Sequence, residues 1–315
     1  MIPQENPSGD ESGIHQTPGV TGSPVDGAPG VRRPCGSQSI TRNRTLAQLE
    51  LQNAIKIKSY EVFCNVISQF VAGLFRFLLI VGSPGTSKSQ SVKRSVGNRP
   101  HLYLETHATA FGMYHELFKH QNLPVIIDDL DHIYRDPASV RILKCLCNTD
   151  SVKRLRWPSR HADVVSELVP ASFTTSSPVC LIANEWQTKN ANVQAIEDRA
   201  IVVHFIPSAE EIHSKVADWF TDADVYGFIG EFLSFVPRHS MRYYEKGTQL
   251  RQAFPDGWKE PLLQSMGVDE EVRAIIPLIM SPDYSSDAER IAAFEAAGYG
   301  SRATFYRWKK RLGIV

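Results

Sequence analysis

The residues with the clearest chemistry are Lys88 and Ser89, which follow a glycine-containing turn after an apolar run. They fit the pattern G-x-x-x-x-G-K-[ST], except that Ser87 stands where the second glycine belongs. In such a loop the backbone N–H groups surround phosphate oxygens, the lysine ammonium reaches the outer phosphates, and the hydroxyl can ligate Mg²⁺. A helix beginning at the lysine adds the partial positive charge of its N-terminus. We therefore predict a phosphate loop for ATP and Mg²⁺, and the alternative is a plain strand–turn–helix connection. The predicted loop consists of Gly82, Ser83, Pro84, Gly85, Thr86, Ser87, Lys88 and Ser89.

Two other apolar runs end in polar side chains. Residues 123–127 lead into Asp128 and Asp129, and residues 179–183 lead into Asn184. Ligands of open α/β sheets bind at the carboxyl ends of the strands, so these groups should meet at one edge with the loop. Asp128 is expected to hold Mg²⁺ together with Ser89, and Asp129 to orient or deprotonate an attacking water. Asn184 could bond that water or a γ-phosphate oxygen. The simpler alternative is that these polar residues only end strands and begin turns.

The elements that must position these residues alternate between strand and helix. Such alternation predicts an α/β protein with three layers, in which helices cover both faces of a central parallel sheet. Nearly continuous apolar runs are typical of strands that are buried on both faces. We expect strands at 77–82, 102–105, 123–129, 179–184 and 201–206, and helices at 45–75, 88–97, 111–120 and 139–147. After Pro207 the pattern is mostly helical, at 209–220, 225–235, 240–254, 269–280, 287–297 and 301–312.

Composition excludes several classes of protein. The net charge is zero, so no global field attracts nucleic acid or membrane. Five cysteines are an odd number in a chain of this length, which argues for reduced thiols and a cytoplasmic location rather than a disulfide framework. The N-terminus lacks the features of a secretory signal. The most apolar stretch, 62–82, contains Asn65, Gln69 and Arg76, so we expect no membrane span. Residues 1–44 are rich in Pro, Gly and Ser and are predicted to form a disordered tail.

Between residues 45 and 254 the chain resembles the AAA+ family of P-loop ATPases. The segment 82–89 is similar to the Walker A loop, in a form closest to that of minichromosome-maintenance helicases. Residues 125–129 resemble Walker B, and residues 181–184 resemble the strand that ends in the sensor-1 asparagine. The resemblance implies that Arg199 is an arginine finger and that Arg242 is a sensor-2 arginine facing the nucleotide. It also implies an all-α lid after Pro207.

The resemblance has consequences for activity and assembly. A finger that acts on a neighbouring subunit requires a homo-oligomer, so a ring or a filament is expected. Family members usually carry glutamate at the position of Asp129, and aspartate is one methylene shorter. We therefore expect an ATPase whose turnover could be slow, with nucleotide binding more secure than rapid hydrolysis.

The end of the chain is basic. Residues 301–312 contain five basic side chains and no acid, and Phe305, Trp308 and Leu312 have the spacing of an inward face. With the preceding helix and glycine turn, this segment resembles the helix-turn-helix units of transposases and recombinases. The alternative is a terminal helix whose cations complement its own dipole. The candidate DNA contacts are Arg302, Thr304, Tyr306, Arg307, Lys309 and Lys310.

A second basic stretch, 153–161, could grip nucleic acid or form a solvated hairpin. The expected domains are the tail 1–44, a nucleotide-binding α/β domain 45–207, a helical lid 208–265 and a helical domain 266–315 with the helix-turn-helix. Three functions remain open: an ATPase driving a DNA-associated process such as replication, transposition or mobile-element maintenance, a nucleotide-switched DNA-binding regulator or scaffold with little hydrolysis, and a protein remodeller that binds no DNA.

Overall fold

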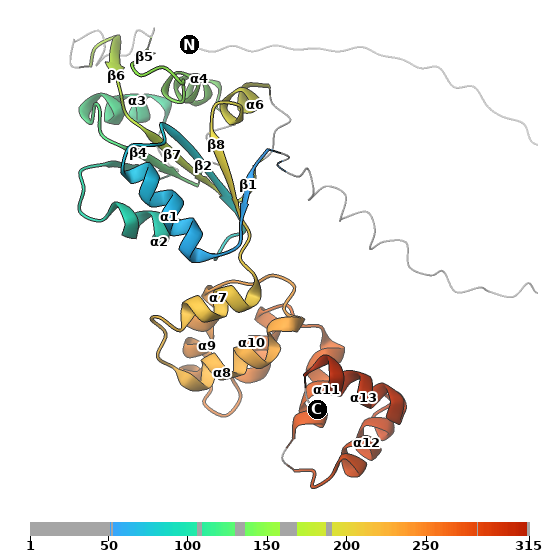
Figure 1. The fold of residues 1–315 in the computed structure, drawn as a ribbon. Helices are drawn as coiled ribbons and strands as arrows, with labels where there is room; N and C mark the ends of the chain where they lie inside the picture. Colours follow the sequence, from blue (N-terminus) through green and yellow to red (C-terminus); the bar gives the residue numbers. More distant parts are fainter. Residues whose placement is uncertain are drawn as a thin grey trace, which may run out of the picture. The chain divides into compact units, whose positions relative to one another are not determined.

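The computed structural model describes residue 51 and residues 53–105, 109–129, 136–157, 169–186, 191–281 and 283–313 (Figure 1). Every described residue belongs to one compact unit, Glu50–Val315. The predicted tail, 1–44, lies outside the described residues, as do residues 158–161 of the second basic stretch. The proposed domain boundaries at 207 and 265 stay predictions.

A six-stranded parallel sheet forms the centre of the first half of this unit (Figure 1). Its order is β1-β8-β2-β7-β4-β3, so β2 and β4 are both hydrogen-bonded to β7. The five predicted strands are confirmed within two residues at each end. The strands are β1 (Ile55–Ile57), β2 (Phe77–Gly82), β3 (Leu102–Leu104), β4 (Val125–Asp128), β7 (Val179–Ala183) and β8 (Ile201–Phe205).

Helices cover both faces of the sheet, which confirms the three-layer α/β fold. On β2, Leu78 and Ile80 pack into one hydrophobic core and Leu79 and Val81 into another, because successive side chains of a strand point to opposite faces. The first core contains α1 (Tyr60–Val71) and α2 (Lys88–Val96). The second contains α3 (Ala110–Lys119), α4 (Pro137–Leu146) and α6 (Ala191–Glu197).

The single helix predicted over 45–75 is wrong in its first part. Residues 55–57 form β1, which pairs in parallel with β8, Ile55 opposite Val203. The helix begins after Ser59, whose hydroxyl accepts from the backbone N–H of Glu61 as an N-cap. Leu51 and Ile55 have the i, i+4 spacing of a helix, whereas Ile55 and Ile57 have the two-residue spacing of a strand, and pairing with β8 makes 55–57 a strand.

A two-stranded antiparallel hairpin, β5 (Lys153–Arg156) with β6 (Ser172–Thr175), carries the described part of the second basic stretch. Lys153 is 2% exposed, and its ammonium donates to the carbonyl of Ser177 at 2.6 Å. Burial lowers the pKa of Lys153. This lysine is therefore part of the interior, whereas Arg154 and Arg156 are exposed.

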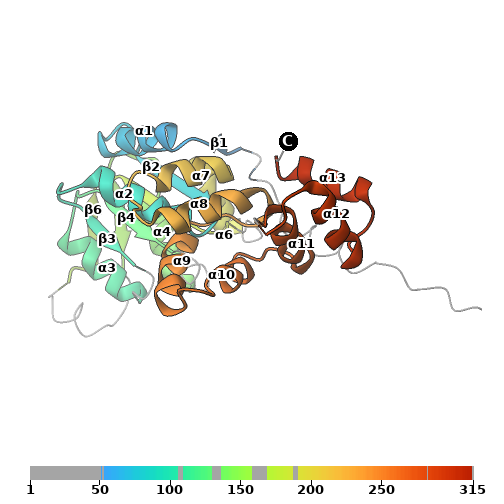
Figure 2. The same cartoon turned by 90° about the horizontal axis from the view of Figure 1, so that it is seen from below.

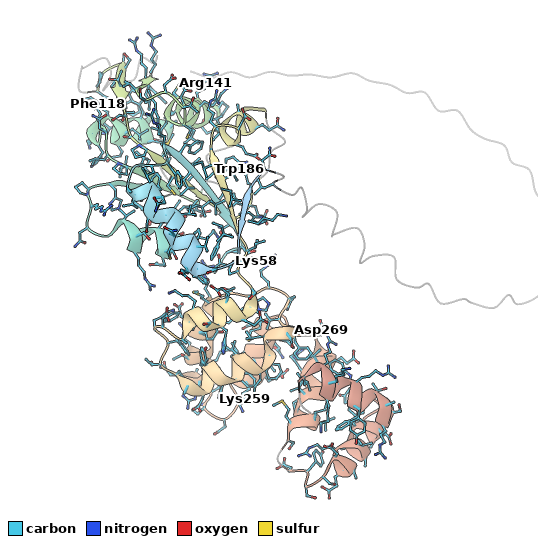
Figure 3. All side chains as sticks on the ribbon, in the orientation of Figure 1. Lys58, Phe118, Arg141, Trp186, Lys259 and Asp269 are labelled. Carbon is cyan, nitrogen blue, oxygen red and sulfur yellow. The ribbon has the colours of Figure 1, made fainter. Side chains whose placement is uncertain are left out.

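The described residues of 208–313 are mostly helical, as predicted, and among them α10 was not predicted. Figure 2 shows α11, α12 and α13 as the last group along the chain, and Figure 3 labels Lys259 in α10 and Asp269 before α11. None of the described helices is long and apolar enough to cross a membrane. The helices are α7 (Ala209–Val216), α8 (Ala223–Phe232), a short 3-10 helix (Leu233–Phe235), α9 (Arg242–Ala253), α10 (Lys259–Ser265), α11 (Glu270–Met280), α12 (Asp287–Ala296) and α13 (Arg302–Arg311).

Candidate nucleotide site

The loop between β2 and α2 has the backbone that a phosphate loop requires. Gly82 ends β2, where an added Cβ would lie 2.4 Å from the carbonyl oxygen of Phe205 on β8. Gly85 has a φ of +79°, a conformation that L side chains rarely adopt. Ser87 has a φ of 60° at the position where the motif has glycine, so the serine adopts a glycine-like conformation. Its side chain makes no cap bond to α2, and the first N–H groups of that helix remain available to an anion.

Lys88 lies at the centre of the site. Its side chain is buried, and its ammonium donates to the carbonyls of Gly82 at 2.7 Å and Ser83 at 2.8 Å. The same ammonium donates to Oδ1 of Asn184 at 3.2 Å, so the loop and the end of β7 converge. Burial is the main cause that lowers the pKa of Lys88 to about 8; the carboxylate of Asp128 opposes this shift, and the positive charge of Arg242 adds to it.

Strand register brings the acidic residues to the same edge. Asp128 of β4 lies opposite Ile182 of β7, and Ile182 lies opposite Ile80 of β2. Gly82 and Asn184 each lie two residues beyond this row, so the ends of three adjacent strands meet. Asp129 is exposed, has a φ of 57°, and donates its N–H to the carbonyl of Ile182 at 3.1 Å. Its backbone is left-handed, which is uncommon for residues other than glycine.

Two tyrosines at this site were not predicted. The phenol of Tyr103, on β3, donates to Oδ2 of Asp128 at 2.6 Å, and burial together with this bond raises the Tyr103 pKa. The phenol of Tyr60, at the start of α1, donates to the carbonyl of Thr86 at 3.0 Å. Burial also raises the pKa of Tyr60. No motif marks either residue, because each reaches the site through strand order or helix packing.

The helical region contacts the loop directly. The N–H of Met241 donates to the carbonyl of Gly85 at 2.8 Å, and Glu211 of α7 accepts from the N–H of Tyr60 at 2.7 Å. Arg242, the first residue of α9, is exposed, and its charge acts on Lys88. The predicted sensor arginine therefore lies near the predicted phosphate loop.

Arg199 bonds to the helix before it rather than to the predicted phosphate loop. It follows α6, and its guanidinium donates to the carbonyl of Ala195 in that helix. Nearby, Trp186 donates its indole N–H to Glu197 at 2.9 Å, which fixes the end of α6 to the segment after β7. Within the described part of the chain, no hydrogen bond joins Arg199 to the loop 82–89. A role in the site of its own subunit has no support, and a role in a neighbouring subunit stays a prediction.

The residues present fit a magnesium ion that is bound with a nucleotide. Ser89 and Asp128 offer oxygen ligands, and Mg²⁺ is usually held by one or two carboxylates together with substrate phosphates. No group of three or more His, Cys, Asp or Glu side chains that could hold a metal occurs among the described residues. A metal at this edge would therefore take most of its ligands from phosphate and water.

The C-terminal helix presents part of the predicted DNA-binding set to solvent. Arg302, Tyr306, Arg307 and Lys310 are exposed, whereas Phe305 is fully buried against Phe294. Two predicted contacts lie off this exposed face. The ammonium of Lys309 is 2.8 Å from Oδ2 of Asp287, with 15% of its side chain exposed, and Thr304 is half-buried beside Gly300.

No protein-family model and no curated protein sequence matches the chain. Among solved structures, a chain of Drosophila ORC bound to DNA has 16% identity and a TM-score of 0.38, covering 91% of this chain and 84% of that chain. A RuvB mutant of Thermotoga maritima has 11% identity and a TM-score of 0.40, covering 76% and 83%. A DNA replication initiation factor has 13% identity and a TM-score of 0.38, covering 73% and 70%.

Proposed function

We propose that this chain is an ATPase of the AAA+ type that binds ATP with Mg²⁺ and uses it in a DNA-associated process. The observation that carries the proposal is the convergence of Lys88, Asn184 and Asp128 at the ends of three adjacent strands beside a loop with left-handed backbone at Gly85 and Ser87. A plain strand–turn–helix connection needs neither a buried lysine nor a polar side chain from another strand to meet it. Burying an ammonium is costly unless polar groups surround it.

The residues have separate roles in this proposal. Lys88 exchanges its bonds to the loop carbonyls for bonds to the outer phosphate oxygens, where its charge stabilises the negative charge that develops during transfer. Ser89 and Asp128 would hold the ion, which would neutralise phosphate charge when bound. Asp129 orients the attacking water, and Asn184 bonds either that water or the γ-phosphate. Arg242 contacts the nucleotide from α9.

Titration with a fluorescent ATP analogue tests the binding site. Lys88→Ala should abolish binding, because the variant leaves the buried end of the loop without a cation. Asp129→Asn should retain binding and lose phosphate release, since an amide cannot accept the proton of the water. Unchanged nucleotide affinity in Lys88→Ala would refute the loop assignment, and normal turnover in Asp129→Asn would show that another group orients the water.

A homo-oligomer is part of the proposal through Arg199. Arg199 follows α6 and donates to the carbonyl of Ala195 in that helix, and within the described part of the chain no hydrogen bond joins it to the loop 82–89. Mixing Arg199→Ala subunits with Lys88→Ala subunits tests this assembly. Recovery of phosphate release in the mixture, when each variant alone is inactive, is expected if the arginine serves a neighbouring site. A mixture that stays inactive would count against a finger in trans.

DNA binding is proposed for the exposed face of α13. Arg302, Tyr306, Arg307 and Lys310 lie on this face, and basic side chains on one helix face are suited to phosphate contacts. Arg307→Ala with Lys310→Ala should weaken DNA binding and lower the slope of log affinity against log salt by about 1 for each phosphate that is no longer neutralised. Arg141→Ala with Lys119→Ala removes two exposed cations from α4 and α3 as a charge-matched control (Figure 3 labels Arg141). Equal slopes for both double variants would refute the α13 assignment.

A nucleotide-switched DNA-binding protein with little hydrolysis is the second candidate, and one set of contacts favours it. The guanidinium of Arg311 lies 5.0 Å from the ring of Phe235 and 4.9 Å from that of Trp308, which attaches α13 to the 3-10 helix. Six residues after Phe235, Met241 donates to Gly85 in the loop. DNA affinity measured without nucleotide, with ADP and with ATP separates the two candidates. A switch changes DNA affinity with nucleotide even in Asp129→Asn, whereas a hydrolysis-driven process requires turnover.

A further inference from the structure

Tyr103, a residue of the central sheet, contacts the proposed magnesium ligand Asp128 but belongs to none of the sequence motifs. It lies on β3, opposite Ile126 of β4, and its phenol donates to Oδ2 of Asp128 at 2.6 Å. The distance is short for an O–H donor and is typical of a bond to a charged acceptor. The Tyr103 side chain is half-buried, so water competes with this bond less than it would at the surface.

The ring of Tyr103 is also held from a second element. The ammonium of Lys93, in the last turn of α2, lies 4.3 Å from the ring centroid. The same ammonium is 3.3 Å from Glu105, just after β3. Since α2 carries Ser89 near its start, Tyr103 contacts both elements that supply a proposed magnesium ligand.

We propose that Tyr103 is a positioning residue that fixes the Asp128 carboxylate, and with it the spacing between Asp128 and Ser89, for a nucleotide-bound divalent ion. The inference rests on the proposed ATP site. A phenol bonded to Oδ2 restricts rotation of the carboxylate and leaves Oδ1 free for the ion. Groups that hydrogen-bond to metal ligands in this way commonly contribute 10- to 100-fold to metal affinity.

Tyr103→Phe tests this role because it removes only the hydroxyl. Binding of a fluorescent ATP analogue is measured over a range of Mg²⁺ concentrations and again with EDTA. We expect the Mg²⁺ concentration that gives half of the metal-dependent increase in affinity to rise about 10-fold, the lower end of that range, because Asp128 is only partly buried. Affinity in EDTA should not change, since Lys88 and the loop N–H groups do not depend on Tyr103.

Tyr114→Phe is the matched control. Tyr114 lies on α3 in the same part of the molecule, and its phenol donates to the carbonyl of Pro170 at 2.8 Å, away from Asp128. This variant also loses a phenol hydrogen bond and should lower thermal stability without changing the Mg²⁺ dependence. Lys93→Ala keeps the phenol but removes the ammonium beside the ring, and a smaller shift in the same direction is expected.

Each outcome separates the inference from the function on which it rests. An unchanged Mg²⁺ midpoint in Tyr103→Phe overturns the positioning role, as does an equal loss of affinity with and without Mg²⁺, which indicates a structural role. Wild-type protein that binds nucleotide without any response to Mg²⁺ overturns the inference and the ligand role of Asp128, but leaves the phosphate loop intact. Wild-type protein that binds no nucleotide either with Mg²⁺ or in EDTA refutes the proposed function itself.

Discussion

Replacing Gly85 with alanine should separate the phosphate loop from the helical segment that contacts it. A Cβ at this position would lie 1.9 Å from Oγ of Ser240 and 2.8 Å from its Cβ, well inside ordinary van der Waals separation. Met241, the next residue after Ser240, donates its N–H to the carbonyl of Gly85. The added methyl group must therefore displace the segment before α9 or distort the loop.

The magnitude follows from comparison with Gly73, which has nearly the same φ. Gly73 has a φ of +80° and no atom within 4 Å of an added Cβ, whereas Gly85 has a φ of +79° and the Ser240 contact. Both variants carry the penalty of a left-handed alanine, about 1–2 kcal/mol, offset by about 0.4–1 kcal/mol from the unfolded chain. These backbone effects cancel in the difference. Gly85→Ala should lower the free energy of unfolding by about 1–3 kcal/mol more than Gly73→Ala, the usual cost of overpacking.

Urea unfolding of the two variants and of Gly85→Ala with Ser240→Gly measures this difference. The double variant removes Oγ and Cβ of Ser240 and leaves Cα at 3.3 Å from the new methyl group, so most of the additional loss should be recovered. Ser240→Gly alone loses the bond from the N–H of Arg242 to Oγ at 3.2 Å, at a cost of a few tenths of a kcal/mol. If Gly85→Ala is no less stable than Gly73→Ala, the loop and this segment are not held together as described.

Two further predictions concern pH. Because burial lowers the pKa of Lys88 to about 8, the unfolded chain binds a proton between about pH 8 and 10.5 that the folded chain lacks, and the free energy of unfolding should rise with pH in that window. Urea unfolding of wild type and of Lys88→Met over this pH range tests whether the rise in the free energy of unfolding depends on Lys88. Affinity for the ATP analogue should fall about 10-fold from pH 7 to pH 9 as the ammonium loses its proton. Burial also lowers the pKa of His213, which stacks on Tyr226 at 3.9 Å and lies 2.7 Å from the hydroxyl of Tyr244. Stability should therefore decrease as the pH falls below 6.5, where the unfolded imidazole becomes protonated, and His213→Gln should flatten that decrease; identical acid profiles would contradict it.

Local sequence determined the parts of the fold that depend on neighbouring residues. Continuous apolar runs predicted the buried strands, because a strand covered on both faces must be apolar at every position. Asp128, Asp129 and Asn184 were predicted as site residues because they follow the ends of those runs. The phosphate loop was predicted from the glycine-containing turn before Lys88. Arg242 was placed near the loop by resemblance, and its charge does act on Lys88.

Tertiary structure decided everything that depends on which segments meet. Residues 55–57 became a strand only because β8 supplies hydrogen bonds to them, and no local pattern encodes that partner. In sequence, Lys153 and Lys309 look like surface cations. In the structure Lys153 is buried and donates to the carbonyl of Ser177, and Lys309 forms an ion pair with Asp287. Tyr103 reaches Asp128 because β3 lies beside β4 in this register. The spacing of apolar residues indicates which side chains of a segment face the interior. Strand order and helix packing bring together residues that are far apart along the chain. The chemistry at the edge of the sheet depends on both.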